Sequence, residues 1–303
     1  MLYIYFYKPN NYFSKEHLKR VLRNLVGKYS GPQAVEDSLR RGLSQAVIPH
    51  RFNCSRPKLD GLSVFFVNGS MDCLRWAIKL KAEGKIRKLV AGPNLVVLPE
   101  DRGGIILNPN IDLILFPSEW TKNFFCSRQP ELRDKIEIWP AGVAEHEAIK
   151  NKRKGFLVFY KNNEALFKEI VRFLEEQGEE FDILEYGKFD RVQYYDLLEK
   201  REKMIYISNS ESQGIALQEA WIRDVPTFAY SRGYWEFGKE KWSDKSIGAP
   251  YLTPDCGLFF NSFDDFTNKF KEFANKEFSA RDYCLANLSD KKTTSEFIAF
   301  IER

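Results

Sequence analysis

Residues 208–221 read Ser-Asn-Ser-Glu-Ser-Gln-Gly-Ile-Ala-Leu-Gln-Glu-Ala-Trp, and this stretch carries the most information about the fold. It follows the apolar run 204–207, which predicts a β-strand, and it opens a predicted helix. Ser210 or Ser212 is expected to cap that helix. The stretch is therefore one strand-to-helix connection, and the rest of the chain repeats this arrangement.

Short apolar runs alternate with longer amphipathic stretches along the whole chain. This alternation is typical of repeated βα units and of a parallel sheet. The predicted strands are 2–7, 62–67, 88–91, 113–116, 136–139, 156–160, 181–184, 204–207, 226–230 and 258–260. The predicted fold class is therefore α/β.

Two domains are expected, because 303 residues match two cores of roughly 150 residues each. Residues 140–143 (Pro-Ala-Gly-Val) and the polar, lysine-rich stretch that follows suit an exposed connection. We place an N-terminal domain at 1–146 and a C-terminal domain at 147–284. The two domains are expected to face each other across a cleft at the carboxyl ends of their strands, where open α/β sheets bind ligands.

The composition, with 44% hydrophobic and 29% charged residues, is that of a globular protein and excludes wholesale disorder. The longest apolar runs have about six residues, far fewer than the roughly 18 to 20 that a membrane span needs. Residues 1–7 lack the basic region and the small-residue cleavage site of a secretion signal, and they read as a strand. A cytoplasmic location is therefore expected.

The cysteines and histidines suggest neither metal nor disulfide chemistry. The five cysteines are scattered, without a CxxC pair or a Cys/His cluster, so we expect buried free thiols and predict no metal site. His17, His50 and His146 each stand alone in the sequence, and a solitary histidine is more often structural than catalytic. We therefore assign no role to a histidine.

Positive charge is concentrated in the first half of the chain. Residues 1–150 hold 23 Lys and Arg against 15 Asp and Glu, a net charge of +8, which leaves 23 against 27, a net charge of −4, for residues 151–303. Two clusters hold much of it: Lys15, Lys19, Arg20, Arg23 and Lys28, and then Lys79, Lys81, Lys85, Arg87 and Lys88. We favour solvated helix faces over the alternative, a surface that contacts anionic lipid headgroups or an acidic acceptor. Nucleic acid is not expected as a partner, because no recognised binding motif accompanies the charge.

The quoted stretch also has the features of an anion site. The amides of Gly214, Ile215 and Ala216 would have no acceptor inside the helix, and a glycine at 214 lets a ligand approach the backbone. This arrangement suits a diphosphate. Glu219 is placed to accept two hydrogen bonds from a ribose diol, and Glu211 can do the same for a hexose.

The spacing of these two glutamates is not specific by itself. Glu137 and Glu145 have the same spacing, without the glycine or the preceding strand. An ordinary strand, a capped helix and surface carboxylates would explain the spacing alone, but not the whole string.

The string from Glu211 to Glu219, with Gly214-Ile215 inside it, closely resembles the E-x7-E signature of retaining glycosyltransferases of the GT-B fold, the family-4 type. Other segments resemble the same family in the right order: 31–33 (Gly-Pro-Gln), 116–122 (Phe-Pro-Ser-Glu-Trp-Thr-Lys), 138–143 (Ile-Trp-Pro-Ala-Gly-Val) and 225–227 (Val-Pro-Thr). The resemblance implies two Rossmann-like domains. It also implies that the last helix, residues 285–303, packs back on the first domain.

The resemblance implies transfer of a sugar from a nucleotide-diphosphate donor with retention of the anomeric configuration, without a metal or another cofactor. The sequence also lacks an Asp-x-Asp pair of the kind that holds a metal diphosphate. Carried over by position, Glu219 would hold the ribose and Glu211 the hydroxyls of the donor sugar. Lys161 would neutralise the leaving diphosphate, so Glu211 and Lys161 are the catalytic candidates.

Further residues would complete the donor site. By the same resemblance, Gln213, Gly214 and Ile215 lie beside the sugar or phosphate. Tyr186-Gly187 follows a predicted strand where the base would rest, although a plain turn explains these residues equally well.

The acceptor-side candidates are Gly31, Asn94 and Ser118. Gly31 belongs to the segment that resembles the family's glycine-containing loop, and Ser118 to its strand-to-helix turn. Asn94 stands where the family often has a histidine, so no general base is assigned.

The donor side departs from the family in one respect. Tyr160 precedes Lys161 where the family usually has an arginine, and the next lysine is Lys168. A second phosphate-binding cation is therefore missing or is supplied by Arg232 or Lys239. Independently, the glycine expected after the E-x7-E helix is Asp224, and aspartate can adopt the left-handed conformation.

The leading hypothesis is a retaining glycosyltransferase that uses a UDP- or GDP-linked sugar and a glycan, a glycolipid or another hydroxyl acceptor, with or without peripheral contact with an anionic membrane. One alternative is a non-catalytic sugar-nucleotide or glycan-binding protein on the same fold, motivated by the missing arginine and histidine. Another is a different two-domain α/β enzyme, such as an epimerase that acts on a nucleotide sugar.

Overall fold

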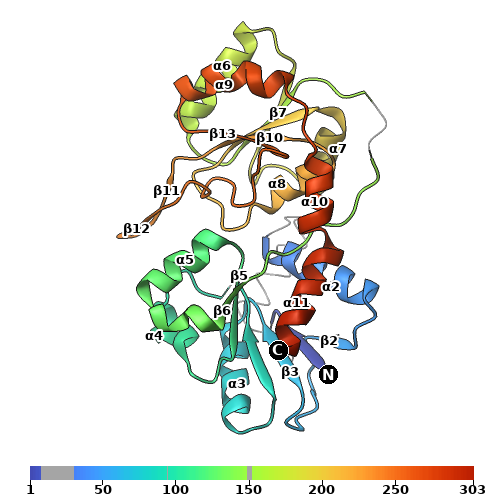
Figure 1. The fold of residues 1–303 in the computed structure, drawn as a ribbon, viewed down its shortest axis with the longest axis vertical. Coiled ribbons are helices and arrows are strands. Elements are labelled where there is room, and N and C mark those ends of the chain that lie inside the picture. Colours follow the sequence, from blue (N-terminus) through green and yellow to red (C-terminus); the bar gives the residue numbers. More distant parts are fainter. Residues whose placement is uncertain (8–30, 94, 149–151) are drawn as a thin grey trace. The chain divides into compact units, whose positions relative to one another are not determined.

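The computed structural model describes residues 1–7, 31–93, 95–148 and 152–303 (Figure 1). The chain folds into two compact units. Unit 1 comprises Met1–Gly142 with Thr293–Arg303, and unit 2 comprises Val143–Lys292. Each unit contains one parallel sheet, which confirms the predicted α/β class.

Unit 1 contains a six-stranded parallel sheet with the order β2-β1-β3-β4-β5-β6. Every residue of β1, β3 and β5 is buried, as is typical of a parallel sheet covered on both faces. The strands are β1 (Leu2–Tyr5), β2 (His50–Phe52), β3 (Val64–Val67), β4 (Lys88–Ala91), β5 (Leu113–Phe116) and β6 (Ile136–Ile138). The helices are α2 (Gly31–Gln45), α3 (Met71–Ala82), α4 (Asp101–Gly104), α5 (Glu119–Arg128) and α11 (Asp290–Glu302), with short 3-10 helices at Ile105–Leu107 and Pro130–Lys135.

Aromatic packing ties the C-terminal helix α11 to this sheet. The ring of Phe297 lies 5.1 Å from that of Phe66 in β3 and 5.2 Å from that of Trp139, and all three side chains are fully buried. Trp139 Nε1 also donates to the carbonyl of Thr293 at 2.9 Å. The end of the chain is therefore part of the core of unit 1.

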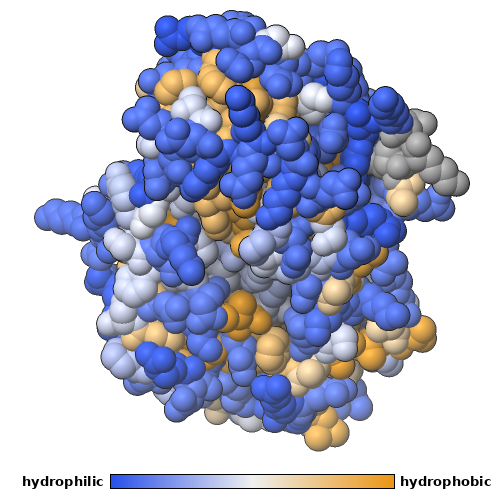
Figure 2. Space-filling view, turned by 45° about the horizontal axis from the view of Figure 1, so that its top comes forward, coloured by the Kyte–Doolittle hydropathy of each residue, from blue (hydrophilic) through white to orange (hydrophobic). Residues whose placement is uncertain are grey.

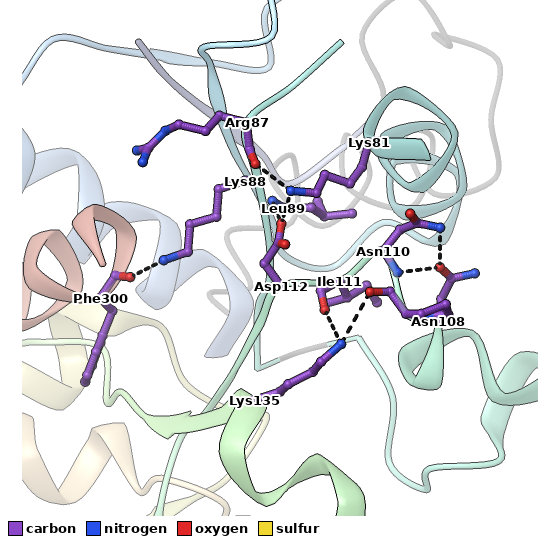
Figure 3. Close-up of polar contacts among 11 residues, drawn as sticks. Lys81, Arg87, Lys88, Leu89, Asn108, Asn110, Ile111, Asp112, Lys135 and Phe300 are labelled. Carbon is purple, nitrogen blue, oxygen red and sulfur yellow. Dashed lines mark hydrogen bonds and ion pairs between the residues drawn. The ribbon is translucent and has the colours of Figure 1, made fainter. Parts of the chain in front are cut away.

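Polar side chains close the amino-terminal ends of β4 and β5 (Figure 3). Lys81 lies 2.8 Å from the Asp112 carboxylate, which also accepts a hydrogen bond from the Leu89 amide at 2.7 Å. Lys88 donates to the carbonyl of Phe300 near the end of α11, at 2.8 Å. A lysine near a helix C-terminus satisfies carbonyls that have no partner inside the helix.

These contacts account for much of one predicted basic cluster. Besides Lys81 and Lys88, Lys79 and Lys85 lie 3.9 and 2.7 Å from the carboxylate of Glu83. The other cluster, residues 15–28, lies outside the described residues. A lipid-binding role for either cluster stays a prediction.

Unit 2 contains a five-stranded parallel sheet with the order β13-β10-β9-β7-β8. A separate antiparallel hairpin, β11 (Tyr234–Phe237) with β12 (Glu240–Ser243), follows β10. The other strands are β7 (Phe156–Tyr160), β8 (Phe181–Glu185), β9 (Lys203–Ile207), β10 (Thr227–Tyr230) and β13 (Gly257–Phe260). The helices are α6 (Glu164–Glu176), α7 (Arg191–Lys200), α8 (Ile215–Trp221), α9 (Phe263–Asn275) and α10 (Ala280–Leu288).

Alternate residues of the central strands feed two hydrophobic cores, one on each face of the sheet. Leu157 and Tyr206 pack with residues of α7, α8 and α10. Val158 and Ile205 pack with residues of α6 and α9. Because successive side chains of a strand point to opposite faces, this division covers both faces and fixes the helices around the sheet.

The structure contains every predicted strand and adds three that the sequence analysis missed. One is β2, which has only three residues and therefore shows no periodicity. The others form the β11–β12 hairpin, which the sequence pattern does not predict.

The prediction of one terminal helix over 285–303 is wrong. The segment forms α10 and α11, separated at Ser289, where the backbone is extended (φ −67°, ψ 153°). The Val143 amide donates to the Leu288 carbonyl, and the Asp290 amide donates to the Val143 carbonyl, both at 2.9 Å. In a continuous helix these backbone groups would be paired inside the helix. Because they pair with Val143 instead, the helix is interrupted at Ser289.

The surface drawn in Figure 2 is mostly hydrophilic, and its apolar patches are small and separate. Within the residues described, no helix has both the length and the apolar composition needed to cross a bilayer.

Candidate functional site

The candidate site lies at the carboxyl ends of three neighbouring strands in unit 2. The chain passes from β7 to β8 on one side of it, and then crosses from β8 to β9 on the other side of β7. This reversal of strand order is a topological switch point, where open α/β sheets bind ligands. Lys161 follows β7, Tyr186 follows β8 and Ser208 follows β9, so all three belong to one edge of the sheet.

Helix α8 begins directly after Gly214, which has a left-handed backbone (φ 80°, ψ 50°). No side chain caps the helix, so the prediction that Ser210 or Ser212 caps it is wrong. A side-chain cap has to come from the residue next to the first helical turn, and that position is occupied by the glycine. Asp224, after the helix, also has a left-handed backbone (φ 56°), as predicted.

The first amides of α8 are available to a ligand. Among the described residues, none accepts a hydrogen bond from the amides of Gly214, Ile215 or Ala216. A Cβ at position 214 would lie 2.9 Å from Leu217 Cδ1, so the glycine is required by both space and backbone conformation. The three amide hydrogens present a local positive potential.

Glu211 lies close to Gly214, and its donors among the described residues include Lys161 and two hydroxyl groups. Its Oε1 lies 2.8 Å from Lys161 Nζ, and it accepts hydrogen bonds from the Tyr206 hydroxyl at 2.7 Å and the Ser208 hydroxyl at 2.8 Å. The Glu211 side chain is 11% exposed and the Lys161 side chain 26%. Lys161 Nζ also lies 4.9 Å from the centre of the Tyr186 ring. The predicted catalytic pair is thus one ion pair in this structure.

The ion pair keeps its lysine charged. Burial alone would lower the pKa of Lys161, but the charge of Glu211 and its hydrogen bond outweigh burial and raise that pKa above its usual value. Burial and the Glu211 charge raise the pKa of Tyr206 well above the ordinary range, so its hydroxyl remains a donor at neutral pH. Lys161, which the family resemblance predicts beside the leaving diphosphate, is therefore positively charged at neutral pH.

Glu219 is buried on α8, with its side chain 9% exposed. Its Oε1 lies 2.7 Å from Arg191 Nη2 and accepts a hydrogen bond from the Tyr195 hydroxyl at 2.7 Å. Both partners come from α7, four residues apart, and therefore from the same face of that helix. Arg223, which follows α8, places its guanidinium 3.8 Å above the Tyr195 ring.

The remaining donor-side candidates lie around these groups. Gln213 is buried and its Nε2 donates to Gln218 Oε1 at 3.0 Å. Tyr186 is exposed, and Gly187 has a left-handed backbone (φ 84°) with open space around it. Both residues are exposed after β8.

Lys168, the next lysine after Lys161, and the two suggested second cations, Arg232 and Lys239, have separate environments. Lys168 pairs with Glu164 one turn away at 2.7 Å, and both side chains are exposed. Arg232 lies 2.8 Å from Glu236 in the hairpin. Lys239 is exposed in the hairpin turn, between β11 and β12.

The acceptor-side candidates belong to unit 1 and have separate environments. Ser118 is buried, with its hydroxyl 3.2 Å from that of Thr121 at the start of α5. Gly31 is the first described residue of α2 and is exposed. Residues 31–33, which resemble the family's glycine-containing loop, begin this helix, so the prediction of a loop there is wrong. Asn94 also lies outside the described residues.

Four of the described residues that hold the two glutamates are not predicted from the sequence. Tyr206 and Ser208 bind Glu211, and Arg191 and Tyr195 bind Glu219. Arg191 and Tyr195 stand four residues apart in α7, a spacing that places two side chains on one helix face. Their partner depends on how α7 packs against α8, which local sequence does not specify.

No family model matches this sequence, and no curated protein matches it. Solved structures do match. The lipopolysaccharide outer core galactosyltransferase WaaB in its apo form aligns with a TM-score of 0.58 and 12% identity over 99% of both chains. The chain has the GT-B fold. The predicted fold class is therefore confirmed.

Two further structures share the fold. A mutant of S. aureus TarM, in complex with fondaparinux, alpha-GlcNAc-glycerol and UDP, aligns with a TM-score of 0.53 and 13% identity over 80% of this chain and 55% of that one. A complex of accessory secretory proteins 1, 2 and 3 from Streptococcus pneumoniae aligns with a TM-score of 0.53 and 9% identity over 82% of this chain and 53% of that one. This chain thus spans nearly the full length of WaaB and about half of the other two.

Proposed function

We propose that this protein is a glycosyltransferase that moves a sugar from a nucleotide-diphosphate donor to a hydroxyl acceptor. The observation that carries the proposal is the arrangement at the switch point of unit 2. Three amides at the start of α8, which have no acceptor among the described residues, stand in the sequence between two largely buried carboxylates, and a charged lysine is bound to one of these. The combination offers donors to a diphosphate and acceptors to sugar hydroxyls on the same edge of one sheet.

Each donor-site residue has a proposed contact. Glu219 accepts the ribose hydroxyls, Glu211 accepts hydroxyls of the transferred sugar, and Lys161 with the amides of Gly214 and Ile215 binds the diphosphate. In this binding mode the diphosphate competes with Glu211 for Lys161, and the Tyr206 and Ser208 hydroxyls continue to hold the carboxylate. Tyr186 and Gly187 form the floor for the base, and Gln213 supports the loop.

We further propose that transfer proceeds with retention and without a metal. The bond between the anomeric carbon and the diphosphate oxygen breaks, the acceptor oxygen bonds to the anomeric carbon on the same face, and the acceptor proton passes to the departing phosphate. The lysine and the fixed amides stabilise the charge that develops on the diphosphate. No side chain is needed as a general base in this scheme.

The nucleotide is proposed to be UDP or GDP, and the acceptor a glycan or a glycolipid. The TarM structure of the same fold holds UDP, which makes UDP the first probe. Unit 2 is the proposed donor-binding domain, and unit 1, with Gly31, Asn94 and Ser118, the acceptor-side domain. A lipid-linked acceptor would bring the basic clusters of unit 1 to an anionic membrane surface.

Nucleotide release tests the proposal. Purified protein is incubated with UDP-, GDP- and ADP-sugars and a panel of glycan and glycolipid acceptors, and the free nucleotide and the glycosylated product are measured. At least one donor is expected to be consumed, and Glu219→Ala and Lys161→Ala are expected to lower the rate about 100-fold or more. The matched controls are Glu175→Ala and Lys271→Ala, exposed residues on α6 and α9, which are expected to retain the wild-type rate.

A non-catalytic binding protein is the second candidate. The observation that favours it is that Glu211 already engages Lys161, while Tyr160 occupies the position where a second cation was expected. Such a protein binds nucleotide sugars without releasing nucleotide in the presence of any acceptor. Binding without turnover across the panel would replace the transferase by this second function, and a product sugar still attached to its nucleotide would indicate an epimerase.

A further inference from the structure

Glu219 is held by two side chains that come from a different helix. We infer that Arg191 and Tyr195 are positioning residues that make Glu219 selective for a ribose with both hydroxyls present. The inference rests on the proposed function, because it concerns the nucleotide of the same site. It adds a role for two residues that no part of the sequence pattern assigned.

The Glu219 carboxylate has acceptor capacity beyond its contacts with α7. An ionised carboxylate has two oxygens with about four lone-pair directions. Arg191 and Tyr195 both bind Oε1 of Glu219, at 2.7 Å each. No described residue donates to Oε2 of Glu219, so its two lone pairs remain for a ligand. A vicinal diol has two hydroxyl donors and fits this remaining capacity.

The donor directions are fixed by the contacts among the three side chains. Arg191 Nε donates to the Tyr195 oxygen, so the phenolic hydrogen is directed away from Arg191 and toward Glu219. Burial, followed by the charge of Glu219, raises the pKa of Tyr195, so the phenol keeps its hydrogen at neutral pH. The carboxylate therefore has one orientation in which both of its Oε1 bonds are satisfied.

The Tyr195 ring is also held in place. The Arg223 guanidinium lies 3.8 Å from the ring centre, and that of Arg191 lies 5.0 Å from it. Arg223 Nη1 donates in turn to the backbone carbonyl of Glu219 at 3.1 Å. The backbone and the carboxylate of Glu219 are thus fixed through the same tyrosine.

Charge explains why an arginine is required. A buried carboxylate needs a counter-charge, since an unpaired buried charge is costly. Arg191 supplies it through Oε1, and the ribose hydroxyls, which are neutral, bind Oε2. With Arg191 replaced, Glu219 would turn toward other donors and lose its fixed orientation.

The test compares ribose and deoxyribose nucleotides. The probes are UDP, GDP and ADP and their 2′-deoxy forms, and the dissociation constants are measured by isothermal titration calorimetry. A hydrogen bond to a charged acceptor corresponds to a preference of about 10- to 100-fold for the ribonucleotide over its 2′-deoxy form. Wild-type protein is expected to show this preference for the nucleotide that binds most tightly.

The variants separate positioning from binding. Tyr195→Phe removes one donor but keeps the ring under Arg223, and it is expected to lower the preference at least about threefold. Arg191→Gln is expected to lower it further. If that variant does not fold, Arg191→Lys replaces it, and because lysine keeps the charge but lacks the two separate donors that bind Tyr195 and Glu219, a lower preference is again expected. Glu219→Gln should abolish the preference. Thermal melting confirms that each variant is folded.

The matched control is the neighbouring tyrosine. Tyr194→Phe also removes a buried phenol from α7, but the Tyr194 hydroxyl donates to the Ala216 carbonyl at 2.6 Å and does not contact Glu219. Its preference for ribose is expected to equal that of the wild type, even if its melting temperature is lower.

Each outcome has one consequence. If none of the three nucleotides binds, the proposed function and this inference both fail. If one binds and the wild type shows no preference for ribose, or Tyr195→Phe and the Arg191 variants keep the full preference, the inference fails and the proposed function stands. A preference that falls in those variants and persists in Tyr194→Phe supports it.

Discussion

Lys161 Nζ lies 2.8 Å from Glu211 Oε1, although 50 positions separate the two residues in the sequence. Lys161 follows β7 and Glu211 lies in the loop after β9, and these strands are neighbours in the sheet. Because parallel strands end at the same edge, residues that follow each strand meet there. The proposed anion site therefore already contains an ion pair, and its lysine is the residue that we propose binds the diphosphate.

Breaking this pair is expected to destabilise unit 2. Lys161→Met removes the cation that lies 2.8 Å from the mostly buried Glu211 carboxylate, so we expect a loss of about 1–3 kcal/mol in the free energy of unfolding, between the values for exposed and buried pairs. Urea denaturation measures this loss. Lys168→Met, which breaks an exposed pair, is the control and should cost less than about 0.5 kcal/mol. Combining Lys161→Met with Glu211→Gln should cost less than the sum of the two single changes, and additive losses would contradict a direct interaction.

The stability from this pair should depend on pH only in the alkaline range. The pKa of Lys161 is raised above its ordinary value of 10.5, because the charge and hydrogen bond of Glu211 outweigh burial, which acts in the opposite direction. The contribution is therefore fully present below the unfolded pKa and is lost as pH rises through the higher folded pKa. The difference in unfolding free energy between wild type and Lys161→Met should stay constant from about pH 6 to 9 and shrink above about pH 10.5. A difference that already shrinks between pH 7 and 9 would mean that the pKa is lowered.

Two glycines with the same backbone conformation should respond differently to alanine. Gly214→Ala must adopt a positive φ and also displace Leu217, whose Cδ1 lies 2.9 Å from the new Cβ. Gly187→Ala has a positive φ and no atom within 4 Å of the new Cβ. The backbone term costs roughly 1–2 kcal/mol in each case, so Gly214→Ala should be the more destabilised variant in thermal or urea unfolding. Equal losses would show that the contact with Leu217 relaxes without cost.

Alkylation should separate the cysteines by burial. All five thiols are free, and Cys54 is partly exposed while the other four are buried. Burial raises the pKa of Cys256 to about 11, so this thiol is almost entirely protonated at pH 8. Iodoacetamide at pH 8, followed by peptide mass spectrometry, should modify Cys54 first and the other four only after denaturation. Early modification of Cys256 in folded protein would refute this order.

Local sequence predicted the strands of both sheets because each is a short apolar run with a turn or helix on either side. It missed β2 because three residues show no period, and it merged α10 with α11 because the break depends on the pairing of Val143 with the segment around Ser289. The capping prediction failed for a related reason. The backbone conformation of Gly214 sets the first residue of α8. The sequence contains two serines nearby that are common helix caps, but neither stands directly before the helix.

The sequence by itself determined that this chain alternates strands and helices, and that one strand leads through a glycine into a helix flanked by two glutamates. These are local properties, set by side-chain period and by backbone conformation. Tertiary structure alone decided which groups bind the glutamates. Arg191 and Tyr195 reach Glu219, and Lys161 reaches Glu211, only because the sheet order and the packing of α7 on α8 bring distant segments together. These contacts depend on how strands β7 and β9 pair and on how α7 and α8 pack in one core, and no short stretch of sequence contains that information.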